Sequence, residues 1–263
     1  MLVRRSRNPL KRAMMALAPA RATVFALRHG STARNLGGVG MDQIRGHEDV
    51  PMTPGGEQEV CLTAWQIGKI GIERVYASDL SRASRSAEII SEENVGYPEI
   101  VLTPALRSWD MGPGMEGKVT TPDVIEIIEN WVRDDRVVPP GGESFRAYCS
   151  RVIDFVGPVF DAAVAHGETV AIMAHGRVVQ IIDFWCAAGC DEECMHREFA
   201  EYLTEEPDIV PPGGGIHYKY DGLGWIGVVI NSRVPSLGTQ IAAGSYVRPM
   251  NTLAADQFEG PPS

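Results

Sequence analysis

Apolar runs that are typical of strands alternate with amphipathic, helix-like segments along most of the chain. Residues Ala22 to Leu27 form a short β-rich apolar run, and Thr169 to Ala174 form a second one. Short apolar runs bounded by polar and glycine residues are typical of strands that are buried on both faces. Both runs are followed by a His-Gly pair. We therefore expect two buried parallel strands, each with a histidine at its carboxyl end.

Apolar residues spaced three and four positions apart predict helices between the strands. Val60, Ala64 and Ile67 share one face of a helix that Thr53 caps and Pro54 opens. A second helix is predicted to begin at Ser78 and Asp79, and its apolar stripe consists of Leu80, Ala83, Ala87 and Ile90. A third is predicted from Pro122 to Arg133. A fourth, long helix is predicted from about Glu143 to Ala165, with a kink at Pro158.

The remaining strands complete the expected fold. They are predicted at Arg74 to Ala77, Ile216 to Tyr220 and Trp225 to Ile230, the last two joined as a hairpin by the turn at residues 221–224. The segment from Val101 to Gly117 is rich in glycine and proline and is expected to be irregular. Strands that alternate with helices predict a sheet covered on both faces. The expected fold class is therefore α/β, a three-layer αβα sandwich with a mostly parallel central sheet.

Chain length and charge suggest one main domain with two extensions. A chain of 263 residues with 44% hydrophobic content suffices for one sizeable core. Residues 1–22 carry six Lys or Arg and no acid, although the whole chain has a net charge of −10. We expect a basic, disordered extension over residues 1–22, one main domain over 23–231 and an arm or tail over 232–263. A targeting segment is the alternative for the extension, but its apolar stretch is short and broken by Pro19.

The composition also narrows the partners. An acidic balance disfavours a general binder of nucleic acid or anionic membranes, because such partners need a basic surface. No stretch approaches the roughly 18 apolar residues of a membrane span. We therefore expect a soluble, cytoplasmic protein without nucleic-acid or membrane partners, and a homo-oligomer is compatible with the sequence.

Five cysteines, an odd number, do not indicate a disulfide framework. Cys186, Cys190 and Cys194 recur at helical spacing with His196 beyond. We interpret them as buried helix cysteines, and a metal site is the alternative.

The candidate chemistry lies at the two His-Gly pairs. His29-Gly30 and His175-Gly176 are far apart in the sequence, but both follow a buried strand. Neighbouring parallel strands present their carboxyl ends at the same edge of a sheet, so both imidazoles are expected to face one crevice. A glycine after each histidine allows close approach of a substrate oxygen or another backbone. The alternative is that the histidines merely end strands and bond nearby carbonyls.

The residues around these histidines match the motifs of a known family in the family's order. Residues 28–35 (RHGSTARN) fill the pattern R-H-G-x-[ST]-x-x-N, and residues 78–83 (SDLSRA) fill S-x-L-x-R-A. Residues 142–144 (GES) and 174–176 (AHG) match two further motifs. Residues 53–56 (TPGG) match L-T-x-x-G-x-x-Q in part, because Met52 replaces the Leu and Glu59 the Gln. Over roughly residues 23 to 230, the chain resembles branch 1 of the histidine phosphatase superfamily, whose fold is phosphoglycerate-mutase-like.

This resemblance implies a metal-independent phosphatase that passes a phosphoryl group from a small phosphomonoester to His29 and then to water, without a cofactor. A neutral imidazole is a competent phosphoryl acceptor. The resemblance further implies that Arg28, Arg82 and His175 act in catalysis by binding the phosphate oxygens, where the planar guanidinium fork suits a phosphate group. Asn35 is implied as a neutral donor and Gly176 as part of the substrate site. The structural alternatives are a solvated helix residue for Arg82 and a loop cap for Asn35.

The segment that supplies the proton for the leaving group departs from the family's pattern. The family commonly uses a Glu in L-x-E-x-x-x-G-x-x-x-G, whereas residues 106–117 (LRSWDMGPGMEG) place Ser108 there and one additional residue between the glycines. Asp110 is the candidate catalytic acid and Glu116 the second. A substrate that needs no strong acid, or an inactive site, is the remaining interpretation. Trp109 either stacks on an aromatic substrate or packs in the core.

Three further arginines and three further functions stay open at this point. Arg34, Arg45 and Arg107 are interpreted as ordinary surface residues, with positive charge at the site mouth as the alternative.

The competing functions are a phosphoglycerate-type mutase, a catalytically weak module that binds a phosphorylated ligand, and an open-site phosphatase acting on phosphorylated proteins. The displaced acid argues against the mutase, because a mutase must hold its intermediate without losing phosphate to water.

Overall fold

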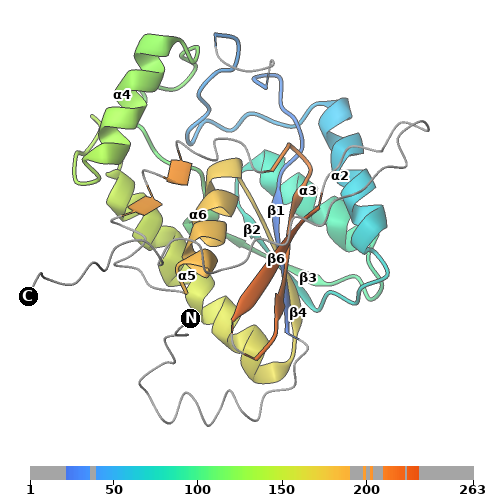
Figure 1. The fold of residues 1–263 in the computed structure, drawn as a ribbon. Coiled ribbons are helices and arrows are strands. Elements are labelled where there is room, and N and C mark those ends of the chain that lie inside the picture. Colours follow the sequence, from blue (N-terminus) through green and yellow to red (C-terminus); the bar gives the residue numbers. More distant parts are fainter. Residues whose placement is uncertain are drawn as a thin grey trace, which may run out of the picture.

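In the part of the chain that the structure describes, six strands form one mixed sheet in the order β3-β2-β4-β1-β5-β6 (Figure 1). The computed structural model describes residues 22–35, 40–189, 198–199, 202–203, 210–222 and 224–230. The strands are β1 (Thr23–Arg28), β2 (Arg74–Ser78), β3 (Glu99–Thr103), β4 (Thr169–Ala174), β5 (Gly215–Tyr220) and β6 (Trp225–Ile230). Strands β3, β2, β4 and β1 are parallel, whereas β5 and β6 are antiparallel to their neighbours. The mostly parallel sheet predicted from the sequence is confirmed.

Helices cover both faces of this sheet. They are α2 (Pro54–Ile67), α3 (Ser81–Glu92), α4 (Pro122–Arg133), α5 (Phe145–His166) and α6 (Gly176–Ala187), and a 3-10 turn lies at Pro104–Leu106. Helices α2 and α3 pack on one face, and α5 and α6 pack on the other, where α4 lies beyond α5 (Figure 1). This is the expected three-layer αβα sandwich.

The two helical layers are held by alternate residues of the central strands. In β1, Val24 and Ala26 belong to the core on the α5 and α6 side, and Phe25 and Leu27 to the core on the α2 and α3 side. All four side chains are completely buried. A strand that must satisfy two cores is apolar throughout, which explains the uninterrupted run seen in the sequence. Each large side chain buried in this way contributes about 1.5 to 3 kcal/mol to folding.

Two sequence predictions near the edge of the sheet are wrong. Residues Glu99–Thr103 form strand β3 and are not irregular, because their backbone pairs in parallel register with β2 at the edge of the sheet. Helix α3 begins at Ser81, after the N-cap residue Leu80, and not at Ser78. Ser78 is still the last residue of β2, where it pairs with Thr103. The chain therefore presents Ser78 and Asp79 at the carboxyl end of the strand.

Helix α5 is close to its predicted limits and continues through Pro158 to His166. Its N-cap is Ser144, whose Oγ accepts a hydrogen bond from the backbone N–H of Ala147 at 3.1 Å. This bond satisfies one of the amide groups that the first turn of a helix leaves without an internal partner. The G-E-S motif therefore fixes the start of this helix.

Several expectations concern residues on which the structure says little or nothing. The basic extension before Ala22, the tail beyond Asn231, and Cys190, Cys194 and His196 lie outside the described residues. Cys186 is buried on α6, as expected. Within the described segments, no group of three or more His, Cys, Asp or Glu side chains is arranged to hold a metal ion. None of the described helices has the length and apolar character needed to cross a membrane.

The N-cap of α5 generates a stability prediction. Replacing Ser144 by Ala removes the cap bond and should lower the free energy of unfolding by about 1 kcal/mol. Thr121 holds the same position at the start of α4, but its side chain makes no cap hydrogen bond. Thr121→Ala is therefore the matched control and should change the free energy by less than about 0.5 kcal/mol. Urea denaturation followed by circular dichroism measures both, and equal losses would contradict the assignment.

Candidate active site

The carboxyl ends of β1 and β4 bring the two predicted histidines together. The parallel register pairs Arg28 with Ala174, and the backbone N–H of His29 donates to the carbonyl of Ala174 at 3.0 Å. The next residues, His29 and His175, consequently lie edge to face with their ring centroids 5.1 Å apart. Two imidazoles separated by more than 140 positions in the sequence thus share one site.

The ring of His29 has a defined orientation and tautomer. The side chain is only 2% exposed, and its Nδ1 lies 2.7 Å from the carbonyl oxygen of Gly30. A carbonyl only accepts hydrogen bonds, so Nδ1 carries the proton and Nε2 presents a lone pair. Burial, together with the positive charge of Arg82, holds the pKa of His29 well below its usual 6.5. His29 is therefore a neutral imidazole with Nε2 available as a nucleophile.

His175 lies at the N-cap of α6, and its Nε2 is 3.0 Å from the hydroxyl of Ser78. Its Nδ1 is buried and has no hydrogen-bond partner among the described residues. Burial and, next, the charge of Arg82 lower the pKa of His175 as well. The hydroxyl of Ser78 reaches His175 because β2 extends to this residue, so the S-x-L-x-R-A motif orients this ring in addition to supplying an arginine.

The glycine after each histidine allows a close approach within the protein. A Cβ on Gly30 would lie 2.0 Å from the carbonyl oxygen of Gly56, at the start of α2. A Cβ on Gly176 would meet the guanidinium of Arg28 at 3.2 Å. Gly30 thus admits the backbone of α2, and Gly176 leaves room for an arginine of the site.

Arg82 is completely buried beside both histidines. Its Nη1 donates to the carbonyl of Glu48 at 2.8 Å and its Nη2 to the carbonyl of Gly46 at 3.2 Å. Carbonyl oxygens carry no net charge, so these bonds fix the guanidinium without neutralising it. Burial, followed by the charge of Arg45, lowers the pKa of Arg82 to about 10. The group remains a cation at neutral pH, and the alternative of a solvated helix residue is excluded.

Arg45 joins this cluster, although the sequence was interpreted as giving it a surface position. Burial, followed by the charge of Arg28, lowers its pKa to about 10, and its own charge acts on His29 and Arg82. Its Nη1 is buried and has no hydrogen-bond partner among the described residues. No motif marks Arg45 in the sequence, so only the fold identifies it.

Arg28, the third arginine of the cluster, donates from Nη1 to the carbonyl of Val210 at 2.7 Å. Its positive charge acts on both His29 and Arg45. Arg28, Arg45 and Arg82 therefore gather around two neutral imidazoles. Concentrated positive charge of this kind is a site for an anion with several oxygen atoms, such as a phosphate group.

The other two arginines considered from the sequence are paired with carboxylates. Arg107 donates to both oxygens of Asp79, at 2.7 and 2.6 Å, and these bonds hold the pKa of the Asp79 carboxyl below its usual range. Arg34 forms an ion pair with Glu48. Because a carboxylate already binds each guanidinium, neither contributes free positive charge to the site.

Asn35 uses its side-chain oxygen within its own loop. Its Oδ1 accepts hydrogen bonds from the backbone N–H and the hydroxyl of Thr32, at 3.0 and 3.1 Å. The amide oxygen thus caps the turn. The role of Asn35 as a donor to substrate stays a prediction.

Glu59 holds the loop that follows His29. Its carboxylate accepts from the backbone N–H and the hydroxyl of Ser31, at 2.7 and 2.8 Å. Glu59 occupies the position where the motif has Gln, and a carboxylate can accept both bonds at once. The replacement is therefore compatible with the loop geometry.

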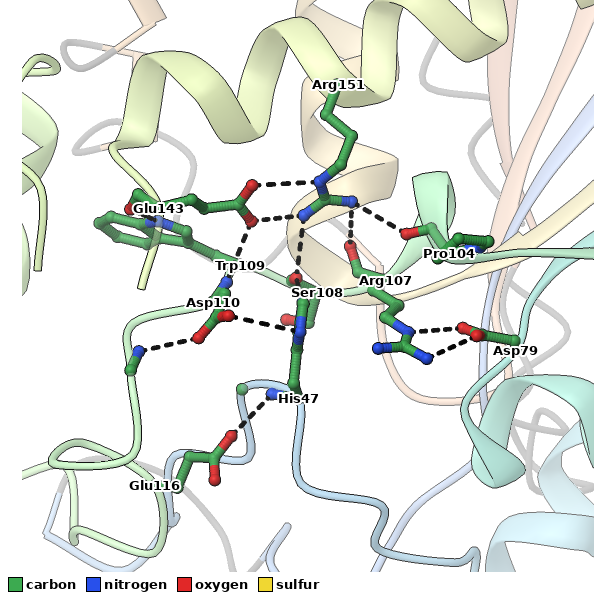
Figure 2. Close-up of polar contacts among 12 residues, drawn as sticks. His47, Asp79, Pro104, Arg107, Ser108, Trp109, Asp110, Glu116, Glu143 and Arg151 are labelled. Atoms are coloured by element: carbon green, nitrogen blue, oxygen red, sulfur yellow. Dashed lines mark hydrogen bonds and ion pairs between the residues drawn. The ribbon is translucent and has the colours of Figure 1, made fainter. Parts of the chain in front are cut away.

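The candidate acid Asp110 lies in a tightly held segment (Figure 2). Its backbone N–H donates to the carboxylate of Glu143 at 3.1 Å, and its Oδ1 accepts from the N–H of Gly112 at 2.9 Å. Its Oδ2 faces Nδ1 of His47 at 3.5 Å. Glu116, the second candidate, accepts from the backbone N–H of His47 at 3.0 Å. Both carboxylates predicted as acids therefore lie against His47, a residue that no motif indicates.

Trp109 is a residue of the core. It is 4% exposed, its Nε1 donates to the carbonyl of Glu143 at 2.9 Å, and its ring packs against Phe145 and Tyr148. The alternative of a stacking platform for an aromatic substrate is therefore wrong, because the ring faces the α5 side of the core.

Comparisons with known proteins agree with this geometry. The model of the histidine phosphatase superfamily (branch 1) matches residues 24–197. The probable phosphoglycerate mutase GpmB of Escherichia fergusonii is 31% identical over 160 residues, which are 58% of this chain and 69% of that protein.

Solved structures share the fold at lower identity. A mycobacterial glucosyl-3-phosphoglycerate phosphatase is 19% identical with a TM-score of 0.61, and the match covers 81% of this chain and 99% of that one. The alpha-ribazole phosphatase from Shigella flexneri is 20% identical with a TM-score of 0.61, and the match covers 82% and 100% of the two chains.

The tautomer of His29 is directly measurable. Because its pKa is held well below 6.5, the neutral form should persist as the pH falls through 6.5, and protonation should begin only at a clearly lower pH. Nitrogen-15 NMR of histidine-labelled protein at pH 6 should show His29 with a protonated Nδ1 and a bare Nε2. The exposed ring of His166 is the reference in the same spectrum. A doubly protonated His29 at this pH would contradict the assignment.

The place of Arg45 in the anion site predicts a loss of phosphate affinity. A hydrogen bond to a charged group contributes about 1.5 to 3 kcal/mol, so Arg45→Ala should weaken binding of inorganic phosphate about 10-fold or more. Isothermal titration calorimetry measures the affinity. Arg136, whose side chain is 80% exposed, supplies the control Arg136→Ala, which should bind phosphate as the wild type does. Equal affinity in all three proteins would exclude Arg45 from the site.

Proposed function

Because the chain belongs to the histidine phosphatase superfamily, branch 1, we propose that it is a metal-independent phosphatase that hydrolyses a small phosphomonoester through a phosphohistidine on His29. The observation that carries this proposal is the unprotonated Nε2 of a neutral, buried histidine whose pKa is lowered by burial and by the charges of Arg82, Arg45 and Arg28. A nucleophile next to a site for a tetrahedral anion is the arrangement that phosphoryl transfer needs. The names of the similar proteins, which include phosphatases and a probable mutase, support the same chemistry.

In the first step, Nε2 of His29 attacks phosphorus while the bond from phosphorus to the ester oxygen breaks. The bond from Nδ1 to the carbonyl of Gly30 keeps the ring in its attacking tautomer and stabilises the positive charge that develops on it. Arg28, Arg45 and Arg82 neutralise the phosphoryl oxygens, whose charge is spread over the transition state. The ring of His175, whose centroid is 5.1 Å from that of His29, completes the site.

In the second step, water attacks the phosphohistidine, and the bond from Nε2 to phosphorus breaks. The products are inorganic phosphate and neutral His29, so the site is ready for another turnover. The fixed arginines serve both steps, because the same phosphoryl oxygens are bound in each. No residue of the cluster has to move between the two steps.

The leaving oxygen of the first step needs a proton unless the alcohol is a good leaving group. Ser108 at the family's Glu position has no acidic proton to give, so we propose that another group beside the segment that carries Asp110 supplies it. The carboxylate of Asp110 faces His47, and a framework of backbone bonds holds it there. Glu116 is the weaker candidate, because it accepts a backbone N–H of the neighbouring loop.

We predict that the purified protein hydrolyses p-nitrophenyl phosphate in the presence of EDTA and that His29→Ala abolishes the activity. The variant lacks the phosphoryl acceptor, whereas nitrophenolate leaves without a proton, so the assay isolates the nucleophile. Release of nitrophenolate measures the rate. His166→Ala, which changes an exposed histidine at the end of α5, is the control and should keep full activity.

Two results would contradict this proposal. Activity that strictly requires added metal would exclude the mechanism, and full activity of His29→Ala would exclude the nucleophile. Incubation with 3-phosphoglycerate separates the runner-up function, a mutase, which the name of the similar Escherichia protein favours. A phosphatase releases inorganic phosphate from this compound, whereas a mutase isomerises it.

A further inference from the structure

His47 occupies a defined place between two segments of the candidate site. Its Nε2 lies 2.9 Å from the carbonyl oxygen of Ser108 (Figure 2). Because a carbonyl only accepts, Nε2 carries a proton, and the nitrogen that gains or loses a proton is Nδ1. Nδ1 faces Oδ2 of Asp110 at 3.5 Å. The residue at the family's Glu position thus contributes its backbone to hold an imidazole.

The loop that carries His47 is tied to the phosphate-binding arginine. Arg82 donates to the carbonyls of Gly46 and Glu48, the residues on both sides of His47. Burial and Arg82 dominate the lowered pKa of His175, and the charge of His47 is among the further contributions. His47 therefore lies close enough to the reacting groups for its charge to act on them.

The partner of His47 is held by a rigid framework. The carboxylate of Glu143 accepts from the N–H of Asp110 and forms an ion pair with Arg151. Arg151 also donates to the carbonyl of Ser108 at 3.3 Å, the oxygen that His47 binds. Asp110 and the carbonyl that orients His47 are thus fixed by one pair of charged residues.

We propose that His47 is the acid that protonates the leaving-group oxygen through Nδ1 and that Asp110, whose carboxylate faces this nitrogen, is the residue that positions the ring. This inference rests on the proposed phosphatase function and concerns the same site. An isolated aspartic acid is ionised at neutral pH, whereas histidine changes its charge in this range and is matched to acid catalysis there. The 3.5 Å separation is longer than the roughly 2.8 Å of a charge-assisted hydrogen bond, so Asp110 does not retain the proton on Nδ1.

The proton balance closes over the two steps. As the bond from Nε2 of His29 to phosphorus forms, the bond from phosphorus to the ester oxygen breaks, and that oxygen takes the proton from Nδ1 of His47. The neutral ring then accepts a proton from the attacking water as hydroxide adds to phosphorus. His47 ends the cycle protonated, as it began.

The charged and titratable groups around His47 have different places in this scheme. Asp110 faces Nδ1. Asp79 forms an ion pair with Arg107, which is the main cause of its lowered pKa, and the charge of His47 is a smaller cause. Glu116 accepts a hydrogen bond from the backbone of this loop, and Arg82 donates to two of its carbonyls. The charge of His47 also acts on His175. Asp110 is thus the carboxylate that faces the proton in question.

His47→Gln tests the assignment. Nε2 of glutamine reproduces the donor to the carbonyl of Ser108 but carries no proton to transfer, so folding and the loop are preserved. Phenyl phosphate and p-nitrophenyl phosphate are matched probes, because phenolate is a much poorer leaving group. We expect the variant to lose about 10²-fold in kcat with phenyl phosphate and less than about threefold with p-nitrophenyl phosphate.

Two further variants complete the test. Asp110→Asn keeps the shape of the side chain but removes the carboxylate that faces Nδ1, so it should lower kcat with phenyl phosphate more than kcat with p-nitrophenyl phosphate. His166→Gln, on the exposed end of α5, should match the wild type with both probes. Equal losses with both probes in His47→Gln, or no loss with either, would overturn the role of His47 alone. A wild-type protein that hydrolyses neither probe would overturn the phosphatase function itself and this inference with it.

Discussion

The parallel pairing of β1 with β4 is the constraint on which the site depends. This register places Arg28 beside Ala174, so the next residue of each strand is a histidine at the same edge of the sheet. A slip of one residue would turn every side chain of a strand to the opposite face. The two cores prevent this, because Val24 and Phe25 are buried against different helical layers. Packing on both faces of the sheet thus sets the separation of the two histidine rings.

The arginines at this edge of the sheet repel one another. Arg45 and Arg82 both have a pKa lowered to about 10, with burial as the main cause and a neighbouring arginine as the next. The carbonyl oxygens of Gly46 and Glu48, which carry no net charge, hold the guanidinium of Arg82 in place. A bound phosphate relieves the repulsion. Under the proposed function, these fixed charges would stabilise the phosphoryl oxygens in the transition state.

Much of this arrangement was predictable from the sequence, but only where strands and motifs carried it. His29 and His175 end apolar runs, and the family motifs mark Arg28 and Arg82. Arg45 and His47 lie in a loop whose path is set by contacts with Arg82, so no local pattern reveals them. Strand β3 was not predicted for a similar reason, because its pairing with β2, and not its composition, determines its structure. Where tertiary contacts determine the backbone, spacing in the sequence carries little information.

The central claim is that phosphoryl transfer passes through Nε2 of one particular imidazole. Mixing the enzyme with a phosphomonoester and quenching in alkali preserves a phosphohistidine, and phosphorus-31 NMR with peptide mass spectrometry identifies the modified atom. The account predicts phosphate on Nε2 of His29. Phosphate on Nδ1, on another residue, or no phosphorylated enzyme during active turnover would contradict it.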